Sequence, residues 1–174
     1  LKIKNFVIAV GDQYVYWCSD DDPELWTPEQ DNLAGYLFIR DIRSDLEGGA
    51  ANDDFVLICS NKEAVKLFYQ GTPYVFGYKK VFDGAGVWNT KSITLVNNTF
   101  FGFGPNGAWV SNGNSFNYID KGSVSDTINT EFELSRSSLA YVGPWSILQH
   151  VFFFVPTFDS IKCYAFNLIN SKWT

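Results

Sequence analysis

The segment between Asn98 and Ile119 constrains the local fold of this chain more than any other. Two Asn-Gly pairs, Asn106-Gly107 and Asn112-Gly113, divide it into three short runs rich in Phe, Trp, Tyr and Val. Gly readily takes the positive φ that tight hairpin turns require, and Asn tolerates it better than most residues. Aromatic and β-branched residues favour the pleated surface of a sheet. The segment therefore predicts a β-meander, with strands at residues 99–103, 107–110 and 115–119.

Apolar strands that begin a similar pattern recur along the chain. They start at Phe6, Phe55, Thr99 and Val151, at spacings of 49, 44 and 52 residues. A further strand is expected between units, at residues 37–42, 93–96 and 139–142. Four strands in about 45 residues are typical of a β-propeller blade, which buries its faces on neighbouring blades. The chain is thus predicted to be all-β, with about three and a half propeller-like blades of four-stranded meanders. A β-sandwich is the alternative, because its strands and turns look alike.

We expect a single propeller segment over residues 1–174, with units at about residues 1–36, 37–86, 87–136 and 137–174. The chain begins at Leu1 and contains no Met, so we expect it to be a fragment of a longer protein and of a larger ring.

The intervening segments carry more local expectations. Polar and Gly-containing stretches predict loops at residues 43–54 and 79–89, and a strand is expected at residues 137–142, ended by Gly143-Pro144. One helix is expected between Ser125 and Leu134, where apolar residues have near-helical spacing and a Ser or Asp can cap the first turn.

Charge is unevenly distributed along the chain. Residues 1–60 carry 12 acidic and 4 basic side chains, and the remainder carry 7 and 9. An acidic surface gains no affinity for phosphates by counterion release, so tight nucleic-acid binding is not expected, although DNA can slide past such a wall. The run Asp20–Asp22 supplies oxygen ligands of the kind that Ca²⁺ prefers, but its spacing matches no recognised calcium loop, and a solvated turn is favoured. The longest apolar run, Val151–Pro156, is too short to span a bilayer.

Residues able to carry chemistry are few. His150 is the only histidine and adjoins an apolar strand, which favours a structural role, and no GxSxG nucleophile motif is present. Cys18, Cys59 and Cys163 are far apart in apolar contexts and are expected to be buried free thiols. We therefore predict no catalytic, cofactor-binding or metal-binding residues, no cofactor and no enzymatic activity. A pair of carboxylates brought together by the fold, as in glycosidases, is the enzyme class that the sequence leaves open.

The tryptophans Trp17, Trp26 and Trp109 have two interpretations, stacking on sugars or packing in the core. Alternation places Tyr14 and Tyr16 on one face of their strand and Trp17 on the other. Both faces are large and apolar, as expected for a blade buried between two neighbours. Core packing is favoured, and a carbohydrate-binding or host-receptor-recognition propeller is the alternative function.

Several patterns resemble the tail nozzle proteins of short-tailed phages, also called tail tubular or tail-stabilisation proteins. They are Tyr14–Ser19 followed by Asp22–Trp26, the unit Phe55–Phe68 followed by Tyr74–Phe76, and Asn97–Gly113 followed by Ile128–Leu134. The similarity extends over about residues 5–174. It implies a propeller-containing protein that forms a ring at the end of the tail tube, conducts DNA and has no catalytic residues. The chain lacks the remaining blades and the tube-attachment segment of that family.

The resemblance implies a structural component of the phage tail, present in the virion and synthesised in the host cytoplasm. Its expected partners are further copies of itself or other tail proteins in a ring. DNA would pass without sequence-specific binding, and no small-molecule ligand is expected.

Overall fold

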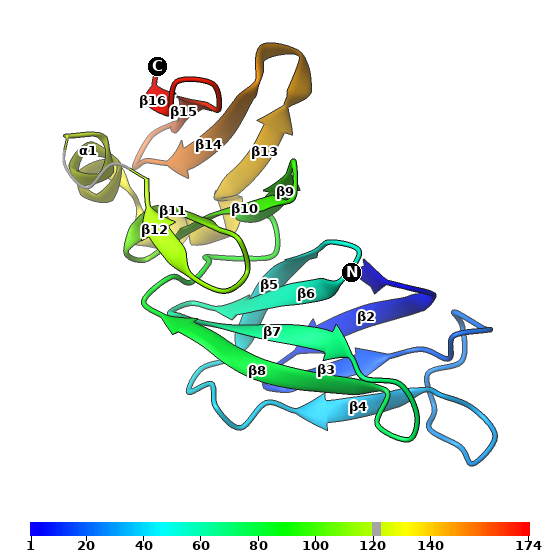
Figure 1. The fold of residues 1–174 in the computed structure, drawn as a ribbon. Helices are drawn as coiled ribbons and strands as arrows, with labels where there is room; N and C mark the ends of the chain where they lie inside the picture. The colour runs from blue at the N-terminus through cyan, green and yellow to red at the C-terminus, as the bar shows by residue number, and fades with distance from the viewer. Residues whose placement is uncertain (120–122) are drawn as a thin grey trace.

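The computed structural model describes residues 1–119 and 123–174 and is built almost entirely of antiparallel sheet (Figure 1). Strands account for 49% of the chain and helix for 9%. The described residues form four sheets of four strands, and in every sheet the strands pair in chain order. This confirms the predicted all-β fold of propeller-like meanders. It differs from a β-sandwich, which packs only two sheets.

The first two sheets occupy the first half of the chain. Sheet 1 consists of β1 (Lys2–Ile3), β2 (Phe6–Gly11), β3 (Tyr14–Trp17) and β4 (Gly35–Phe38). Sheet 2 consists of β5 (Leu46–Ala51), β6 (Phe55–Ser60), β7 (Glu63–Tyr69) and β8 (Phe76–Asp83).

The other two sheets follow in the same order. Sheet 3 consists of β9 (Ile93–Val96), β10 (Thr99–Gly104), β11 (Gly107–Ser111) and β12 (Phe116–Tyr118). Sheet 4 consists of β13 (Tyr141–Trp145), β14 (His150–Pro156), β15 (Ile161–Asn167) and β16 (Lys172–Trp173). Between them lie α1 (Ser123–Glu131) and the short 3₁₀ helix η1 (Leu134–Leu139), and a second 3₁₀ helix, η2 (Ser146–Leu148), connects β13 to β14.

Three cores join consecutive sheets. The first lies between sheets 1 and 2 and includes Trp17 and Ile58. The second joins sheets 2 and 3 around Trp109, and the third joins sheets 3 and 4 around Phe153. Sheets 2 and 3 thus each use one face for the sheet before and the other for the sheet after, whereas sheets 1 and 4 each use one face. The first strands also neighbour one another, since β9 contacts both β5 and β13. This is the inner edge of a radial arrangement.

The Asn-Gly meander forms as predicted. It becomes β10, β11 and β12 of sheet 3, and Gly107 and Gly113 have φ values of 107° and 86°. The repeat is also confirmed: β2, β6 and β10 begin at the predicted residues, and β14 begins at His150, one residue before the predicted start.

The repeat is more complete than three and a half units. The two-residue strands β1 and β16 give sheets 1 and 4 four strands each. The sheets extend over residues 2–38, 46–83, 93–118 and 141–173. The expected boundary between residues 36 and 37 falls inside β4.

The prediction of a loop over residues 43–54 was wrong, because β5 occupies the middle half of it. Its sequence, LEGGAA, lacks the large residues that mark a strand. The small residues are required by close packing: a Cβ at Gly48 would lie 2.7 Å from the backbone of Thr90, and one at Gly49 2.6 Å from the carbonyl oxygen of Leu57. The second loop, at residues 79–89, was also predicted too long, since β8 continues to Asp83.

The prediction of a strand over residues 137–142 was wrong at its start and its end. Residues up to Leu139 belong to η1, and β13 continues through Gly143 and Pro144. Proline is tolerated there because β13 is an edge strand of its sheet. The predicted helix is confirmed as α1, in which Ile128 is fully buried. Within the described residues, no helix combines the length and apolar character needed to cross a membrane.

Candidate functional site

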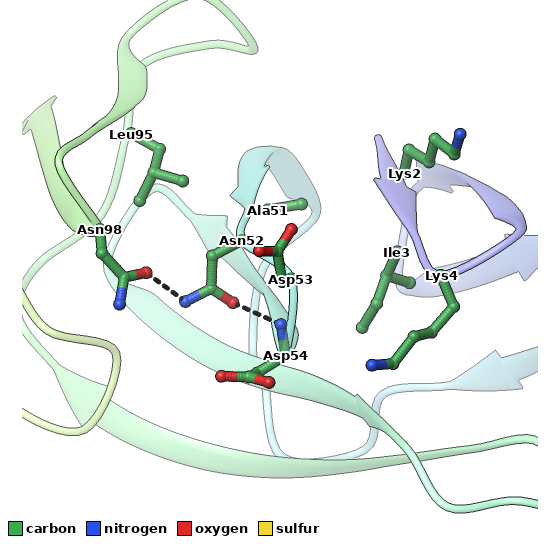
Figure 2. Close-up of a pocket in the computed structure, with 9 residues that line it drawn as sticks. All are labelled: Lys2, Ile3, Lys4, Ala51, Asn52, Asp53, Asp54, Leu95 and Asn98. Carbon is green, nitrogen blue, oxygen red and sulfur yellow. Dashed lines mark hydrogen bonds between the residues drawn. The ribbon is translucent and has the colours of Figure 1, made fainter.

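A hollow of about 810 Å³ opens at the inner edge of sheets 1 to 3 (Figure 2). It is lined by the first strands and their turns: Lys2, Ile3, Lys4, Ala51, Asn52, Asp53, Asp54, Leu95 and Asn98. The position follows from the fold, because the first strand of each sheet lies on the inner edge. The hollow is therefore formed where the first strands of three consecutive sheets meet.

Asparagine side chains hold the turns of this hollow together. Asn52 Nδ2 donates a hydrogen bond of 2.8 Å to Asn98 Oδ1, which ties the β5–β6 turn to the β9–β10 turn (Figure 2). Asn52 Oδ1 accepts from the backbone N–H groups of Asp54 and Phe55, at 3.1 and 2.9 Å. Asn98 has a φ of 61°, a left-handed conformation that Asn tolerates well.

The charged side chains of the hollow have both signs. Lys2 and Lys4 come from sheet 1, whereas Asp53 and Asp54 come from sheet 2, and all four are exposed. Exposed charges of mixed sign are solvated and do not concentrate one type of ligand. The sequence indicated the two aspartates as part of an acidic cluster but missed the lysines, because only the packing of sheet 1 on sheet 2 brings them near.

His150 has the structural role that the sequence favours. Its Nδ1 contacts the carbonyl oxygen of Leu148, and its Nε2 lies 3.3 Å from Asn167 Nδ2. The ring lies parallel to that of Phe152, with centroids 6.2 Å apart. Both nitrogens are thus engaged by groups of its own sheet and its neighbouring turn.

In the acidic loop between β3 and β4, carboxylates accept hydrogen bonds within local turns. Ser19 Oγ donates a 2.5 Å hydrogen bond to Asp21 Oδ1, which lowers the pKa of Asp21 below its usual value. Asp22 Oδ1 accepts from the backbone N–H of Glu24 at 2.9 Å. Across the described ranges, no three His, Cys, Asp or Glu side chains gather as a metal-binding group. The loop geometry fits the interpretation as a solvated turn.

The expectation of three buried thiols was wrong for one cysteine. Cys18 and Cys59 are buried, but Cys163 is exposed. Cys163 pairs with Phe154 on the face of sheet 4 that points away from sheet 3. The sequence could not reveal this, because an apolar strand does not show which of its faces a neighbour covers.

We expect a thiol reagent such as Ellman's reagent to modify Cys163 alone in the folded, dilute protein. Cys18 and Cys59 are protected by burial, which also raises the pKa of the Cys59 thiol. Spectrophotometric titration should count one rapidly reacting thiol, and three after unfolding in guanidinium. The variant Cys163→Ser should show no rapid reaction. Rapid modification of Cys18 or Cys59 in the folded chain would contradict the placement.

Two of the three tryptophans considered for sugar stacking are in the core. Trp17 is 6% exposed and Trp109 is 0% exposed, whereas Trp26 is 37% exposed. Trp109 Nε1 donates a 2.7 Å hydrogen bond to the carbonyl oxygen of Gly86. The core interpretation is confirmed for Trp17 and Trp109, and both are unavailable to a ligand.

A polar cluster that the sequence did not indicate joins α1 to sheet 4. Glu131 Oε1 accepts a 2.6 Å hydrogen bond from Lys162 Nζ, and Glu131 Oε2 accepts one of 2.6 Å from Tyr164 Oη. These bonds, that from Lys162 first, lower the pKa of Glu131. Burial and the neighbouring carboxylate raise the pKa of Tyr164 to about 12. The cluster holds the helix against β15.

The carboxyl group of Glu131 is expected to titrate below 4.5, its ordinary value. A lowered carboxyl pKa stabilises the folded state above the unfolded pKa, and this stabilisation is lost as the pH falls through the folded pKa. The stabilisation is thus present at neutral pH and lost in acid. An NMR titration of Glu131 measures the pKa, and Lys162→Gln should move it back toward 4.5. A value of 4.5 or higher in the unsubstituted chain would contradict the bonding described.

Neither a protein-family model nor a curated protein sequence matches this chain.

Proposed function

We propose that this chain is a structural component of a bacteriophage tail, a nozzle or hub, in which its sheets form part of a ring through which DNA passes. The main observation in favour of the proposal is that the four-stranded sheets pack consecutively, each one on the sheet that follows it in the chain. Radial repetition of this kind builds closed rings with short, protected edges. Together with the sequence patterns that resemble tail nozzle proteins, it favours an architectural role.

The exposed carboxylates of the chain disfavour tight binding of DNA. The acidic loop between β3 and β4 exposes Asp20, Asp21, Asp22, Glu24, Glu29 and Asp31, and the β5–β6 turn exposes Asp53 and Asp54. Carboxylates repel phosphates and release no counterions from DNA. Such a surface would hold DNA weakly, which suits passage.

The ion pairs of the chain also fit a structural role. Lys80 Nζ lies 2.6 Å from both Glu63 Oε1 and Asp83 Oδ1, and Glu63 Oε2 accepts a 2.8 Å bond from the backbone N–H of Arg43. Hydrogen bonds to Asp83 and Glu63 raise the pKa of Lys80. Shifted pKa values often mark active sites, but structural ion-pair networks shift them too. The ion pairs of Lys80 lie where β7, β8 and the segment after β4 meet, and they connect these three parts of the chain.

Immunogold labelling of virions tests the proposal. Antibodies raised against the chain should label the tip of the tail in particles of the phage that encodes it, and pre-immune serum should not. Absence of the chain from purified virions, or labelling confined to the capsid, would contradict a tail role.

Carbohydrate or host-receptor binding is the second candidate, favoured by the exposed rings of Trp26 and Trp145, which are 37% and 49% exposed. Exposed aromatic rings are the side chains that stack on sugars. A glycan array discriminates the two functions. Selective binding that is lost in Trp26→Ala or Trp145→Ala would contradict a purely structural role.

A further inference from the structure

The two outermost sheets each leave one face uncovered. Sheet 1 packs on sheet 2 through Val15 and Trp17, and sheet 4 packs on sheet 3 through Val151 and Phe153. The opposite faces of these two sheets belong to none of the three cores formed by the described residues. They are the surfaces where the row of sheets would continue.

The free face of sheet 1 is an aromatic surface. Tyr14, Tyr16, Tyr36 and Phe38 lie on it as cross-strand neighbours, with ring centroids 5.0 to 6.2 Å apart. Tyr36 is 59% exposed and Tyr16 is 41% exposed. Beside them on β2, the same face carries Ala9 and Gly11 opposite Tyr16 and Tyr14, with Val7 at the start of the strand.

The free face of sheet 4 is also aromatic, but its large side chains lie on different strands from those of sheet 1. Its large rings are on β13 and β14: Tyr141, Trp145, His150, Phe152 and Phe154. The next strand, β15, presents Cys163 and Ala165 opposite Phe154 and Phe152. Contiguous exposed aromatic surface of this kind marks an interaction site.

The two free faces complement each other in shape. Within the chain, the first strands of neighbouring sheets contact one another, as β9 does with β5 and β13. If β13 of one copy likewise lies beside β1 of the other, the bulky β14 would lie over Ala9 and Gly11 of β2. The small side chains of β15 would lie over Tyr14 and Tyr16 of β3. Interdigitation of large and small side chains is how packed sheets exclude voids.

The faces also complement each other in direction. In sheets 2 and 3, one face packs on the preceding sheet and the other packs on the following sheet. The free face of sheet 1 is equivalent to the first of these, and the free face of sheet 4 is equivalent to the second. A contact between them therefore repeats the contacts already present in the chain.

We propose that a second copy of this chain covers these faces, sheet 4 of each copy packing on sheet 1 of the other. Two such contacts related by a two-fold axis close a ring of eight sheets. Strands of about four residues in sheet 1 and about five in sheet 4, at about 3.3 Å per residue and spaced by about 4.8 Å, give faces of roughly 13 by 19 Å and 17 by 19 Å. Two faces per copy supply roughly 570 Å², about 70% of the about 800 Å² per partner of a standard interface. The proposal does not depend on a role in a phage tail.

Light scattering coupled to size-exclusion chromatography tests the proposal on the 174-residue chain. The expected mass is twice the 19.7 kDa of one chain. Tyr16→Glu on sheet 1 and Phe152→Glu on sheet 4 should each give a monomer, because each places a charge in both contacts. Ile169→Glu, which changes a 78% exposed residue in the β15–β16 turn, is the matched control and should remain a dimer. Near-UV circular dichroism verifies that each variant is folded.

Mixing the two monomeric variants tests the head-to-tail arrangement. Tyr16→Glu retains an intact sheet 4 face and Phe152→Glu an intact sheet 1 face, so an equimolar mixture should form a heterodimer through one contact. The reaction rate of Cys163 with a thiol reagent should also fall as the concentration of the unsubstituted chain rises.

Three results would overturn the proposal. The first is an unsubstituted chain that remains monomeric at high concentration. The second is a dimer that persists in either Tyr16→Glu or Phe152→Glu, because a like-with-like contact uses only one of the two faces. The third is a mixture of the variants that stays monomeric while the unsubstituted chain dimerises.

Discussion

Replacement of Trp109 by alanine is expected to lower the free energy of unfolding by about 3–5 kcal/mol, the range for loss of a buried aromatic side chain. Trp109 is 0% exposed in the core between sheets 2 and 3, where its ring meets Phe82 edge-on at 5.9 Å. Its Nε1 donates to the carbonyl oxygen of Gly86. The substitution leaves a cavity and an unpaired buried carbonyl, and both destabilise the fold.

Denaturant unfolding measures this effect, and Trp26→Ala provides the matched control. Trp26 is 37% exposed in the loop between β3 and β4, so its loss is expected to change the free energy of unfolding by only about 0.5 kcal/mol. Trp109→Phe separates the two contributions, because it retains most of the ring volume and removes the hydrogen bond. Equal effects of Trp109→Ala and Trp26→Ala would contradict the packing described.

Replacement of Gly86 by alanine is expected to destabilise the fold by about 3 kcal/mol, the upper end of the range for overpacking. A Cβ at this position would lie 2.0 Å from the carbonyl carbon and 2.1 Å from the carbonyl oxygen of Asn61, and 2.3 Å from the backbone nitrogen of Lys62. These are backbone atoms, which cannot rotate away as a side chain can. The segment carrying Gly86 would have to move, and with it the acceptor for Trp109.

Thermal or denaturant unfolding of Gly86→Ala measures this cost. Gly11→Ala is the control, since no atom lies within 4 Å of a Cβ built there. We expect the control to unfold close to the unsubstituted chain. An unchanged unfolding midpoint for Gly86→Ala would show that the segment between β8 and β9 does not lie as close to the β6–β7 turn as described.

Local sequence signals best predicted the strands that are bounded by Asn-Gly turns or begin with dense apolar runs. The strand expected at residues 37–42 was wrong, since β4 covers Gly35–Phe38. The Asn-Gly turns gave the meander of sheet 3 because their positive φ is a property of the residues. The starts of β2, β6 and β10 followed from dense apolar runs. Strand β5 was missed for the opposite reason, since its Gly48 and Gly49 are selected by the neighbouring backbone and carry no strand signal.

The candidate surfaces depend on tertiary packing and were less predictable. The alternation of side chains along β3 correctly placed Tyr14 and Tyr16 on the opposite face from Trp17. It could not show that only the face with Trp17 is covered. Cys163 was misplaced for the same reason. The polar contacts of Glu131 with Lys162 and Tyr164 join residues more than thirty positions apart, so no local sequence pattern predicts them.

Cryo-electron microscopy of the assembled tail tests the central claim most directly, that the four sheets are consecutive blades of a structural ring. The account predicts ring density at the tail tip into which sheets 1 to 4 fit in order, with their first strands innermost around a channel. Density in which the chain lies outside any ring, or in which another protein separates its sheets from the channel, would contradict it.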